Sequence, residues 1–225
     1  MRLRLKLSGN QPPVPFDYQH QLIGALHKRL GQDNDLHDRL SLYSSSWLHG
    51  GHAAGNHLRF PRGAVWLVSF YDERLIEDFV DRTLADPELC YGMRVTEITQ
   101  QPAPRFGTSH TFRTGSPVLA RAPHPRDAPG QPRHLIYTDP EADDVLTEIL
   151  RRKMDAAGLD TAHKATHVSF DRTYRAAKTK LVTIKNISNR ASVCPVRLEG
   201  TPEGIAFAWT VGIGHSTGSG FGCLL

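Results

Sequence analysis

The sequence predicts an α+β fold of two tandem ferredoxin-like modules, each built in the order β-α-β-β-α-β. Three observations support this fold class. Segments in which every second residue is apolar alternate with segments whose apolar residues recur at helical spacing. The length of 225 residues, 39% of them hydrophobic, suits one large domain or two small ones. A turn-rich stretch at residues 101–107 separates two such patterns, so we expect modules at residues 1–104 and 105–225.

The first half of the chain contains all six elements of one module in order. Residues 1–8 alternate leucine with arginine and lysine, which is the pattern of a half-buried strand. Asp17 can cap the first helix, whose aliphatic residues fall on one face. Residues 49–57, rich in glycine and histidine, are predicted as a loop. The predicted elements are strands at residues 1–8, 40–47, 64–71 and 93–99, and helices at residues 17–30 and from Asp72.

The second half repeats the pattern more loosely. Pro140 suits the first turn of a helix over residues 140–154, because the backbone N–H at that position has no partner within the helix. The remaining apolar segments lie between turn residues, which is typical of strands. These predicted strands are residues 109–113, 117–122, 165–170, 180–187, 193–200, 204–212 and 221–225.

Charge is distributed unevenly along the chain. The formal net charge is +4 and the pI is about 9.1. Residues 151–225 hold 11 Lys and Arg against 5 Asp and Glu, whereas residues 1–150 hold 16 against 18. A basic C-terminal half favours a polyanionic partner such as nucleic acid, and an ordinary solvated surface is the alternative interpretation.

The cysteines and the apolar segments exclude several classes of protein. Cys90, Cys194 and Cys223 are scattered, odd in number and form no CxxC pair. We therefore expect neither a disulfide framework nor a zinc ribbon, and a location in the reducing cytoplasm. No apolar run approaches the length of a membrane span, and the opening residues MRLRLKLSG lack the apolar core of a signal peptide, so we expect no membrane partner.

The chain ends in a glycine-rich segment, VGIGHSTGSGFGCLL, at residues 211–225. Successive glycines allow close approach of two backbones, and their N–H groups can form a nest that binds an anion. The segment lacks the GK[ST] of a phosphate-binding P-loop, and no long helix can follow it as in a dinucleotide-binding fingerprint. We expect a glycine-rich loop between two strands.

This tail resembles the signature of the Cas6 family, the endoribonucleases that process CRISPR repeat transcripts. Members end in a loop of the form glycine-hydrophobic-glycine, several polar residues, then glycine-hydrophobic-glycine. Gly212-Ile213-Gly214 and Gly220-Phe221-Gly222 match its two halves. Residues 14–30, VPFDYQHQLIGALHKRL, resemble the first helix of the family with its lead-in, and residues 136–154, IYTDPEADDVLTEILRRKM, resemble the helix of its second domain. The family has two ferredoxin-like, RNA-recognition-motif-like modules, which agrees with the pattern above.

The resemblance implies cleavage of repeat RNA without a metal ion or other cofactor. The 2′-hydroxyl attacks the adjacent phosphate and leaves a 2′,3′-cyclic phosphate and a 5′-hydroxyl. Such a reaction needs a base, an acid and a cation that stabilises the phosphorane. Histidine suits the first two roles because its ordinary pKa of about 6.5 lies near working pH.

The resemblance also selects candidate catalytic residues. Its members carry the catalytic histidine shortly after the first helix, where His37 lies, so we predict His37 as general base. His27, on the helix itself, is the second candidate, as acid or orienting group. Tyr43 is a further catalytic candidate, and Arg39 and Ser45 are candidate phosphate partners. The alternatives are that His27 packs in the core, that His37 only ends the helix and that Tyr43 is a core aromatic.

Two further groups are candidates for RNA binding. A basic run over residues 172–190 predicts a hairpin that follows phosphates, although it could simply face solvent. Polar residues of the glycine-rich loop could contact phosphates, unless the loop only packs between the modules. The candidates are Arg172, Arg175, Lys178, Lys180, Lys185, Arg190, Gly214, His215, Ser216 and Thr217.

Three functions therefore remain open from the sequence. The first is an endoribonuclease acting on CRISPR repeat RNA to give mature crRNA. The second is a non-catalytic RNA-binding subunit of a CRISPR effector complex, in contact with other subunits. The third is a metal-binding protein built around His49, His52 and His57, which we disfavour because no cysteine or carboxylate joins these histidines. A homodimer is compatible with the first hypothesis.

Overall fold

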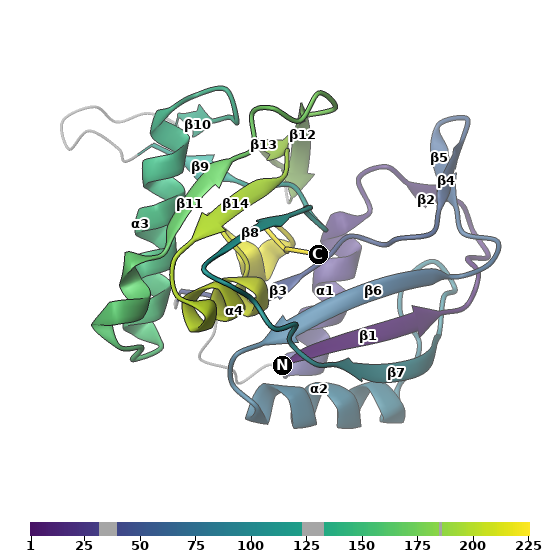
Figure 1. The fold of residues 1–225 in the computed structure, drawn as a ribbon. Helices are drawn as coiled ribbons and strands as arrows, with labels where there is room; N and C mark the ends of the chain where they lie inside the picture. Colours follow the sequence, from purple (N-terminus) through teal and green to yellow (C-terminus); the bar gives the residue numbers. More distant parts are fainter. Residues whose placement is uncertain (32–39, 123–132, 185) are drawn as a thin grey trace.

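The computed structural model describes residues 1–31, 40–122, 133–184 and 186–225 (Figure 1). The predictions for His37, Arg39 and Lys185 lie outside these residues. The described chain forms two α+β modules, one from each half of the sequence (Figure 1). In the described part of the chain, no helix has the length and apolar character needed to cross a bilayer.

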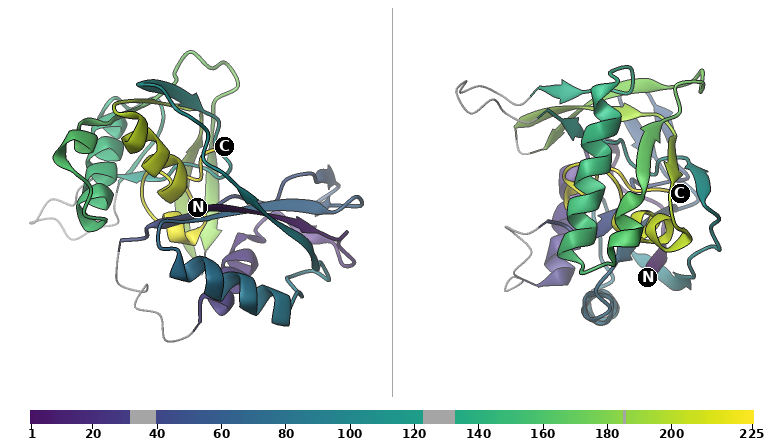
Figure 2. Two further views of the ribbon diagram at one scale, coloured as in Figure 1. Left: turned by 60° about the horizontal axis from the view of Figure 1, so that its bottom comes forward. Right: turned by 60° about the vertical axis from the view of Figure 1, so that its left-hand side comes forward.

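The first module has the predicted β-α-β-β-α-β order. Its antiparallel sheet has the strand order β3-β6-β1-β7, so the first strand lies between the third and the last. Figure 2 shows α1 and α2 on the same face of this sheet. The elements are β1 (Arg2–Leu7), α1 (Gln19–Leu30), β3 (Tyr43–Ser45), β6 (Ala64–Phe70), α2 (Arg74–Ala85) and β7 (Val95–Gln101).

Alternation along β1 decides which side chains enter the core. Leu3, Leu5 and Leu7 are buried, as the pattern predicts, and they pack with Trp66 and Phe79. Burial of such side chains is the main favourable term in folding, at roughly 25 cal/mol per Å² of apolar surface. The prediction of Asp17 as helix cap is wrong, because Tyr18 is the N-cap of α1. No side chain of the N-cap accepts a hydrogen bond from the first N–H groups of this helix.

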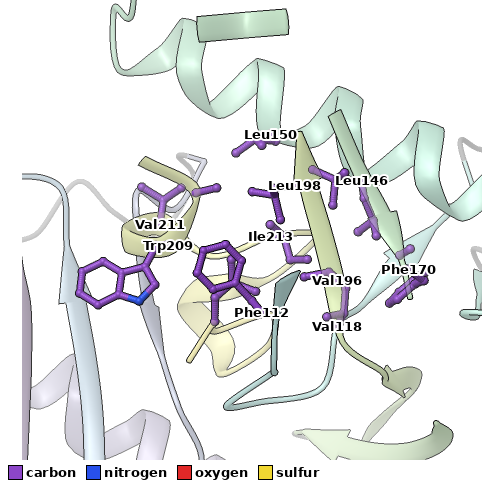
Figure 3. Packing of buried hydrophobic residues seen from close by; sticks show 14 of the residues in the cluster. Phe112, Val118, Leu146, Leu150, Phe170, Val196, Leu198, Trp209, Val211 and Ile213 are labelled. Atoms are coloured by element: carbon purple, nitrogen blue, oxygen red, sulfur yellow. The ribbon is translucent and has the colours of Figure 1, made fainter. Parts of the chain in front are cut away.

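The second module has a similar order with a weaker sheet. Its three strands are ordered β11-β14-β8, and α3 and α4 pack against them (Figure 1). Figure 3 shows side chains of α3, of the strands and of the C-terminal segment meeting in one core. The elements are β8 (Ser109–Phe112), α3 (Glu141–Ala156), β11 (His167–Phe170), β14 (Val196–Glu199) and α4 (Pro202–Val211).

The strand predicted at residues 204–212 is wrong, because these residues form α4. Nearly every residue of this segment is apolar and buried, so its periodicity could not distinguish a buried strand from a buried helix. Two local signals favour the helix. Thr201 caps its start by accepting a hydrogen bond from the Gly204 N–H, and Pro202 occupies the first turn.

The strand predicted at residues 221–225 is reduced to a single bridge. Leu224 pairs with Thr114 beyond the end of β8, and the Leu225 N–H donates to the Arg113 carbonyl at 2.9 Å. The glycine-rich segment therefore follows a helix, α4, instead of connecting two strands as predicted.

Smaller elements complete the chain. Residues 49–57, predicted as a loop, lie largely in a hairpin of β4 (His52–Ala54) and β5 (His57–Arg59), which pairs with β2 (Val14–Pro15). A two-stranded hairpin also forms over the basic run, as predicted. The remaining elements are β9 (Ala120–Arg121), β10 (His134–Leu135), β12 (Lys178–Ile184), β13 (Ile187–Val193) and the 3-10 helices η1 (Thr161–Ala165) and η2 (Thr217–Ser219).

Buried polar contacts fix the two modules against each other. Arg2 donates from Nη2 to the Trp209 carbonyl at 2.7 Å, and its guanidinium lies 3.7 Å from the centre of the Trp209 ring. Ser44 Oγ donates to the Thr210 carbonyl at 2.9 Å. Both acceptors belong to α4, so β1 and β3 of the first module hold the helix that leads into the glycine-rich segment.

Candidate RNA interface

The two glycine-hydrophobic-glycine halves of the terminal segment pack directly on each other. The Ile213 N–H donates to the Gly222 carbonyl at 2.9 Å, and the Gly222 N–H donates to the Pro117 carbonyl at 2.9 Å. Gly222 has φ +63°, and a Cβ there would lie 1.8 Å from the Ile213 carbonyl oxygen. Only glycine fits that position without moving backbone, so the pattern of glycines reflects close backbone packing.

The loop between these halves lies between the two modules (Figure 2). Next to it is β3, because a Cβ at Gly218 would lie 2.5 Å from Ser41 Oγ and 2.6 Å from the Tyr43 hydroxyl. The Trp47 indole N–H donates to the Gly220 carbonyl at 3.0 Å. The loop is therefore a fixed part of the structure with contacts to the first module.

Lys153 of α3 holds the loop from the second module. Its Nζ donates to the Val211 carbonyl at 3.1 Å, to the Gly212 carbonyl at 3.2 Å and to Thr217 Oγ1 at 2.9 Å. Burial lowers the pKa of Lys153 to about 7. The two carbonyls end α4, where the helix dipole favours a positive charge. This side chain ties the end of α4 to the loop.

His215 lies at one side of the loop, in a pocket of about 160 Å³. Its Nδ1 accepts a hydrogen bond from the Arg121 N–H at 3.3 Å. Burial, and secondarily Arg121, lower the pKa of His215 to about 4, so its imidazole is neutral near pH 7. The pocket is lined by Leu40, Ser41, Ile149, Arg152, Lys153, Gly214, His215, Ser216 and Thr217.

His27 and Tyr43 lie next to each other near the loop. Their ring centres are 6.5 Å apart in an edge-to-face arrangement. His27 is half-buried on α1, whereas Tyr43 is buried on β3 and hydrogen-bonded to Ser41, and burial raises its pKa. His37 and Arg39 lie in the chain between Gly31, which follows α1, and Leu40, which lines the His215 pocket.

The basic hairpin of β12 and β13 presents several cations on its surface. Lys178 and Arg190 are exposed and Lys180 is half-buried, and Arg175, which precedes β12, is exposed as well. Arg172, just before the hairpin, is instead engaged by groups of the protein itself. It pairs with Asp143 through an Nη1–Oδ2 contact of 2.6 Å and donates to the Asp139 carbonyl.

Several predicted RNA contacts are buried. Ser45 is fully buried, and its carbonyl accepts a hydrogen bond from Ser116 Oγ at 3.2 Å. Thr217 is buried on Lys153, and Gly214 is buried so closely that a Cβ there would lie 2.5 Å from the Leu119 carbonyl oxygen. Of the four loop residues named from the sequence, His215 and Ser216 are the partly exposed ones.

Four residues of the site were not among those predicted from the sequence: Trp47, Arg121, Arg152 and Lys153. Trp47 is the last residue of the predicted strand at residues 40–47. A large aromatic side chain at the end of a strand was the signal that the sequence offered. Lys153 is part of a basic run, RRK, and its helical spacing from Leu146, Ile149 and Leu150 places it on the apolar face of α3, which was an available signal.

The histidines of residues 49–57 do not form a metal centre. In the described ranges no three His, Cys, Asp or Glu side chains gather in an arrangement that could hold a metal ion. His49, His52 and His57 therefore do not converge, and the hypothesis of a metal-binding protein built around them has no support in this structure.

Comparison with known proteins gives a consistent result. The family model of the C-terminal part of the CRISPR-associated protein Cas6 matches residues 100–225. The fold is similar to the product of a Cas6-related gene from Pyrococcus furiosus, with a TM-score of 0.87, 19% identity, and coverage of 100% of this chain and 97% of that one. It is also similar to a structure described as a RAMP protein binding different RNA substrates, with a TM-score of 0.86, 18% identity, and coverage of 100% and 98%.

A third similar structure is a Cas6 product complex, with a TM-score of 0.65, 19% identity, and coverage of 100% of this chain and 98% of that one. A comparison with curated protein sequences found no match. The TM-scores establish the shared tandem ferredoxin-like fold, and at identities of 18% and 19% they establish the fold alone. The family model covers more than half of the chain.

Proposed function

Because this chain belongs to the Cas6 family of CRISPR-associated proteins, we propose that it cleaves CRISPR repeat RNA in the precursor transcript to give guide RNAs. Processing or binding of repeat RNA is the function associated with the family. The finer proposal is a metal-independent endoribonuclease that forms a cyclic phosphate. RNA is named as the ligand of one protein of similar fold, the RAMP protein, and a bound product in another, the Cas6 product complex.

One observation carries the proposal. A glycine-rich loop lies between the modules; Tyr43, the neighbour of His27, lies beside Gly218, and the basic hairpin packs on Phe221. The phosphates of an RNA strand would find cations at Lys178 and Lys180, which lie on the same face of the hairpin. The segment that carries His37 joins α1 to the pocket at this loop.

The proposed reaction divides between two imidazoles. His37 accepts the proton of the 2′-hydroxyl, and the 2′-oxygen attacks the adjacent phosphorus. The bond from phosphorus to the 5′-oxygen breaks, and His27 donates a proton to that leaving oxygen. A lysine or arginine near the phosphate, with Arg39 as the candidate from the sequence, stabilises the negative charge of the phosphorane. Tyr43, with its hydroxyl buried on Ser41, orients His27 through their edge-to-face contact.

End-labelled repeat RNA incubated with the protein in EDTA tests this function. We expect cleavage at one position, with a 2′,3′-cyclic phosphate on the upstream product and a 5′-hydroxyl on the downstream product. Cleavage that requires a divalent cation, or products with a 5′-phosphate, would contradict the proposed chemistry.

A non-catalytic RNA-binding subunit of a CRISPR effector complex is the second candidate. The burial of Tyr43 is the observation in its favour, because this candidate catalytic hydroxyl is held by Ser41 inside the protein and could contribute to cleavage only through His27. Tight binding of repeat RNA without cleavage in the same assay would select this second function.

A further inference from the structure

A second pocket is lined by residues that bond the last part of the glycine-rich segment, because Trp47 bonds Gly220, Pro117 bonds Gly222 and Ser116 bonds Cys223. It has a volume of about 450 Å³, within the range typical of small-ligand sites. The first module contributes Trp47, and the second contributes the residues after β8 and one face of the basic hairpin. The lining residues are Trp47, Thr114, Gly115, Ser116, Pro117, Lys178, Thr179, Lys180 and Val193.

Trp47 forms an aromatic wall of this pocket and is held in place at its edge. Its indole N–H bonds the Gly220 carbonyl at 3.0 Å, and the ring of Tyr18 packs edge-on with a centre-to-centre distance of 6.4 Å. The ring is half-buried, whereas Trp66 is 0% and Trp209 is 2% exposed. Trp47 is therefore the tryptophan of this chain that a ligand can reach.

Lys180 covers the open face of that ring. Its Nζ lies 4.4 Å from the ring centre, in a cation–π contact. Burial and the neighbouring Lys178 lower the pKa of Lys180, which indicates that no anion compensates its charge. Within the described ranges, neither Lys178 nor Lys180 forms an ion pair with a carboxylate.

The chemistry of this pocket combines a flat π surface with two ammonium groups and small apolar or hydroxyl-bearing walls. A nucleotide has the complementary parts, because its base stacks on an aromatic ring and its phosphate pairs with lysine. An acidic peptide would satisfy the lysines and leave the indole face without a partner. A base inside a duplex cannot enter the pocket, because it is stacked and paired with its neighbours.

On the basis of the proposed RNA-binding function, we propose that this pocket binds one unpaired nucleotide of the repeat RNA, with its base stacked on Trp47 and its phosphate held by Lys178 and Lys180. Lys180 leaves the indole face as the base arrives and moves to the phosphate. Because Trp47 also bonds Gly220, the bound nucleotide fixes the position of the RNA strand relative to the glycine-rich loop.

Tryptophan fluorescence tests this assignment directly, because Trp47 is the accessible indole. The titrant is repeat RNA with 2′-fluoro substitution throughout, which removes the attacking hydroxyl and prevents cleavage. We expect saturable quenching by this RNA and none by the same sequence annealed to its complement. Trp47→Phe should lose the RNA-dependent signal, with a single cooperative thermal unfolding transition as the check on its fold.

A series of these RNAs, each with one abasic position, identifies the stacked base. We expect one position whose base removal abolishes quenching and weakens binding by about 5- to 150-fold, the equivalent of one base–aromatic stack. This series uses the unaltered protein, so the test does not depend on the folding of any variant. Equal quenching by every abasic RNA, or tight binding with no quenching, would overturn the proposal.

The outcomes also separate this proposal from the proposed nuclease function. RNA that binds and is cleaved without any Trp47 signal would leave the nuclease function intact and remove the pocket assignment. RNA that quenches Trp47 at one base and is never cleaved would leave the pocket intact and remove the nuclease function. Absence of RNA binding would contradict both.

Discussion

Lys153 places an amino group inside the protein, against two carbonyls at the end of α4 and the hydroxyl of Thr217. Removing an ammonium from water is costly, and three nearby oxygen atoms offset part of that cost. The result is a lysine whose proton is held less firmly in the folded chain than in the unfolded one. This side chain stabilises the loop geometry on which both pockets depend.

The pH dependence of stability tests this description of Lys153. Between about pH 7 and pH 10.5 the unfolded chain binds a proton at this site that the folded chain has released, so the free energy of unfolding increases with pH across that window. Below pH 7 both states are protonated, and the cost of burying the charge is present in full. We therefore compare the free energies of unfolding of the wild type and Lys153→Met. As pH rises from about 7 to about 10, we expect the wild type to gain stability relative to the variant.

Urea unfolding at several pH values measures this difference. Lys28→Met, which removes an exposed lysine of α1 that pairs with Asp86, is the comparison for loss of an ammonium group at the surface. If the difference in the free energy of unfolding between the wild type and Lys153→Met stays constant from neutral to alkaline pH, the amino group does not titrate as its burial implies.

Gly222 illustrates a second effect of a single residue. Its φ of +63° already disfavours other residues, and a Cβ would meet the Ile213 carbonyl at 1.8 Å. Gly158 has φ +70° with no atom within 4 Å of a Cβ, so a substitution there measures the cost of the positive φ without a steric clash. We expect Gly158→Ala to lower the free energy of unfolding by about 1 kcal/mol and Gly222→Ala by clearly more, measured by urea unfolding. Equal losses for the two variants would show that the loop relaxes around the new methyl group.

At the scale of the element, the hairpin of β12 and β13 projects cations beside the loop. Each phosphate that a lysine or arginine neutralises releases counterions, which makes RNA binding dependent on salt. We expect combined substitution of Lys178, Lys180 and Lys185 by alanine to weaken repeat binding and to reduce the salt slope by about 1 for each phosphate that no longer meets a cation. Filter binding at several salt concentrations measures both quantities.

Arg172 provides a matched comparison for the hairpin. Its guanidinium is engaged by Asp143 and the Asp139 carbonyl, so it has little capacity left for a phosphate. Arg172→Ala should leave the salt slope within error while lowering stability slightly. A triple lysine variant with an unaltered slope would show that the hairpin faces solvent in the complex.

The elements also show what the sequence could predict. Alternation in β1, helical spacing in α2 and the proline at the start of α3 identified those elements correctly, because these signals are local in the sequence. Helix α4 was predicted as a strand, since a segment buried on nearly all sides has no polar face to reveal its period. The cap at Thr201 and the proline at Pro202 were the local signals that could have corrected it.

The candidate site was less predictable, because its members meet through tertiary contacts. The glycine pattern correctly located a loop, yet it could not show that Gly214 and Thr217 are buried. Ser45 was named as a candidate phosphate partner, and packing of the two modules buries it. Trp47 and Lys153 acquire their places through contacts with Gly220 and Thr217, far away in the sequence.

At the scale of the whole molecule, the two modules enclose the loop between them. Arg2 and Ser44 of the first module bond α4 of the second, and α4 leads directly into the loop. One pocket then lies beside His215 and the other beside Trp47. In the function proposed above, an RNA strand crosses the loop with an imidazole near its sugar and an aromatic ring for one base.

In the proposed mechanism, an imidazole next to this loop removes the 2′-hydroxyl proton. Single-turnover cleavage of labelled repeat RNA in EDTA by His37→Ala, with the binding constant measured in parallel, tests this step most directly. We expect a rate reduced by about 100-fold or more, because general base catalysis is removed, with repeat binding weakened no more than a few-fold. An unchanged cleavage rate for His37→Ala would contradict this mechanism and move the base to another residue.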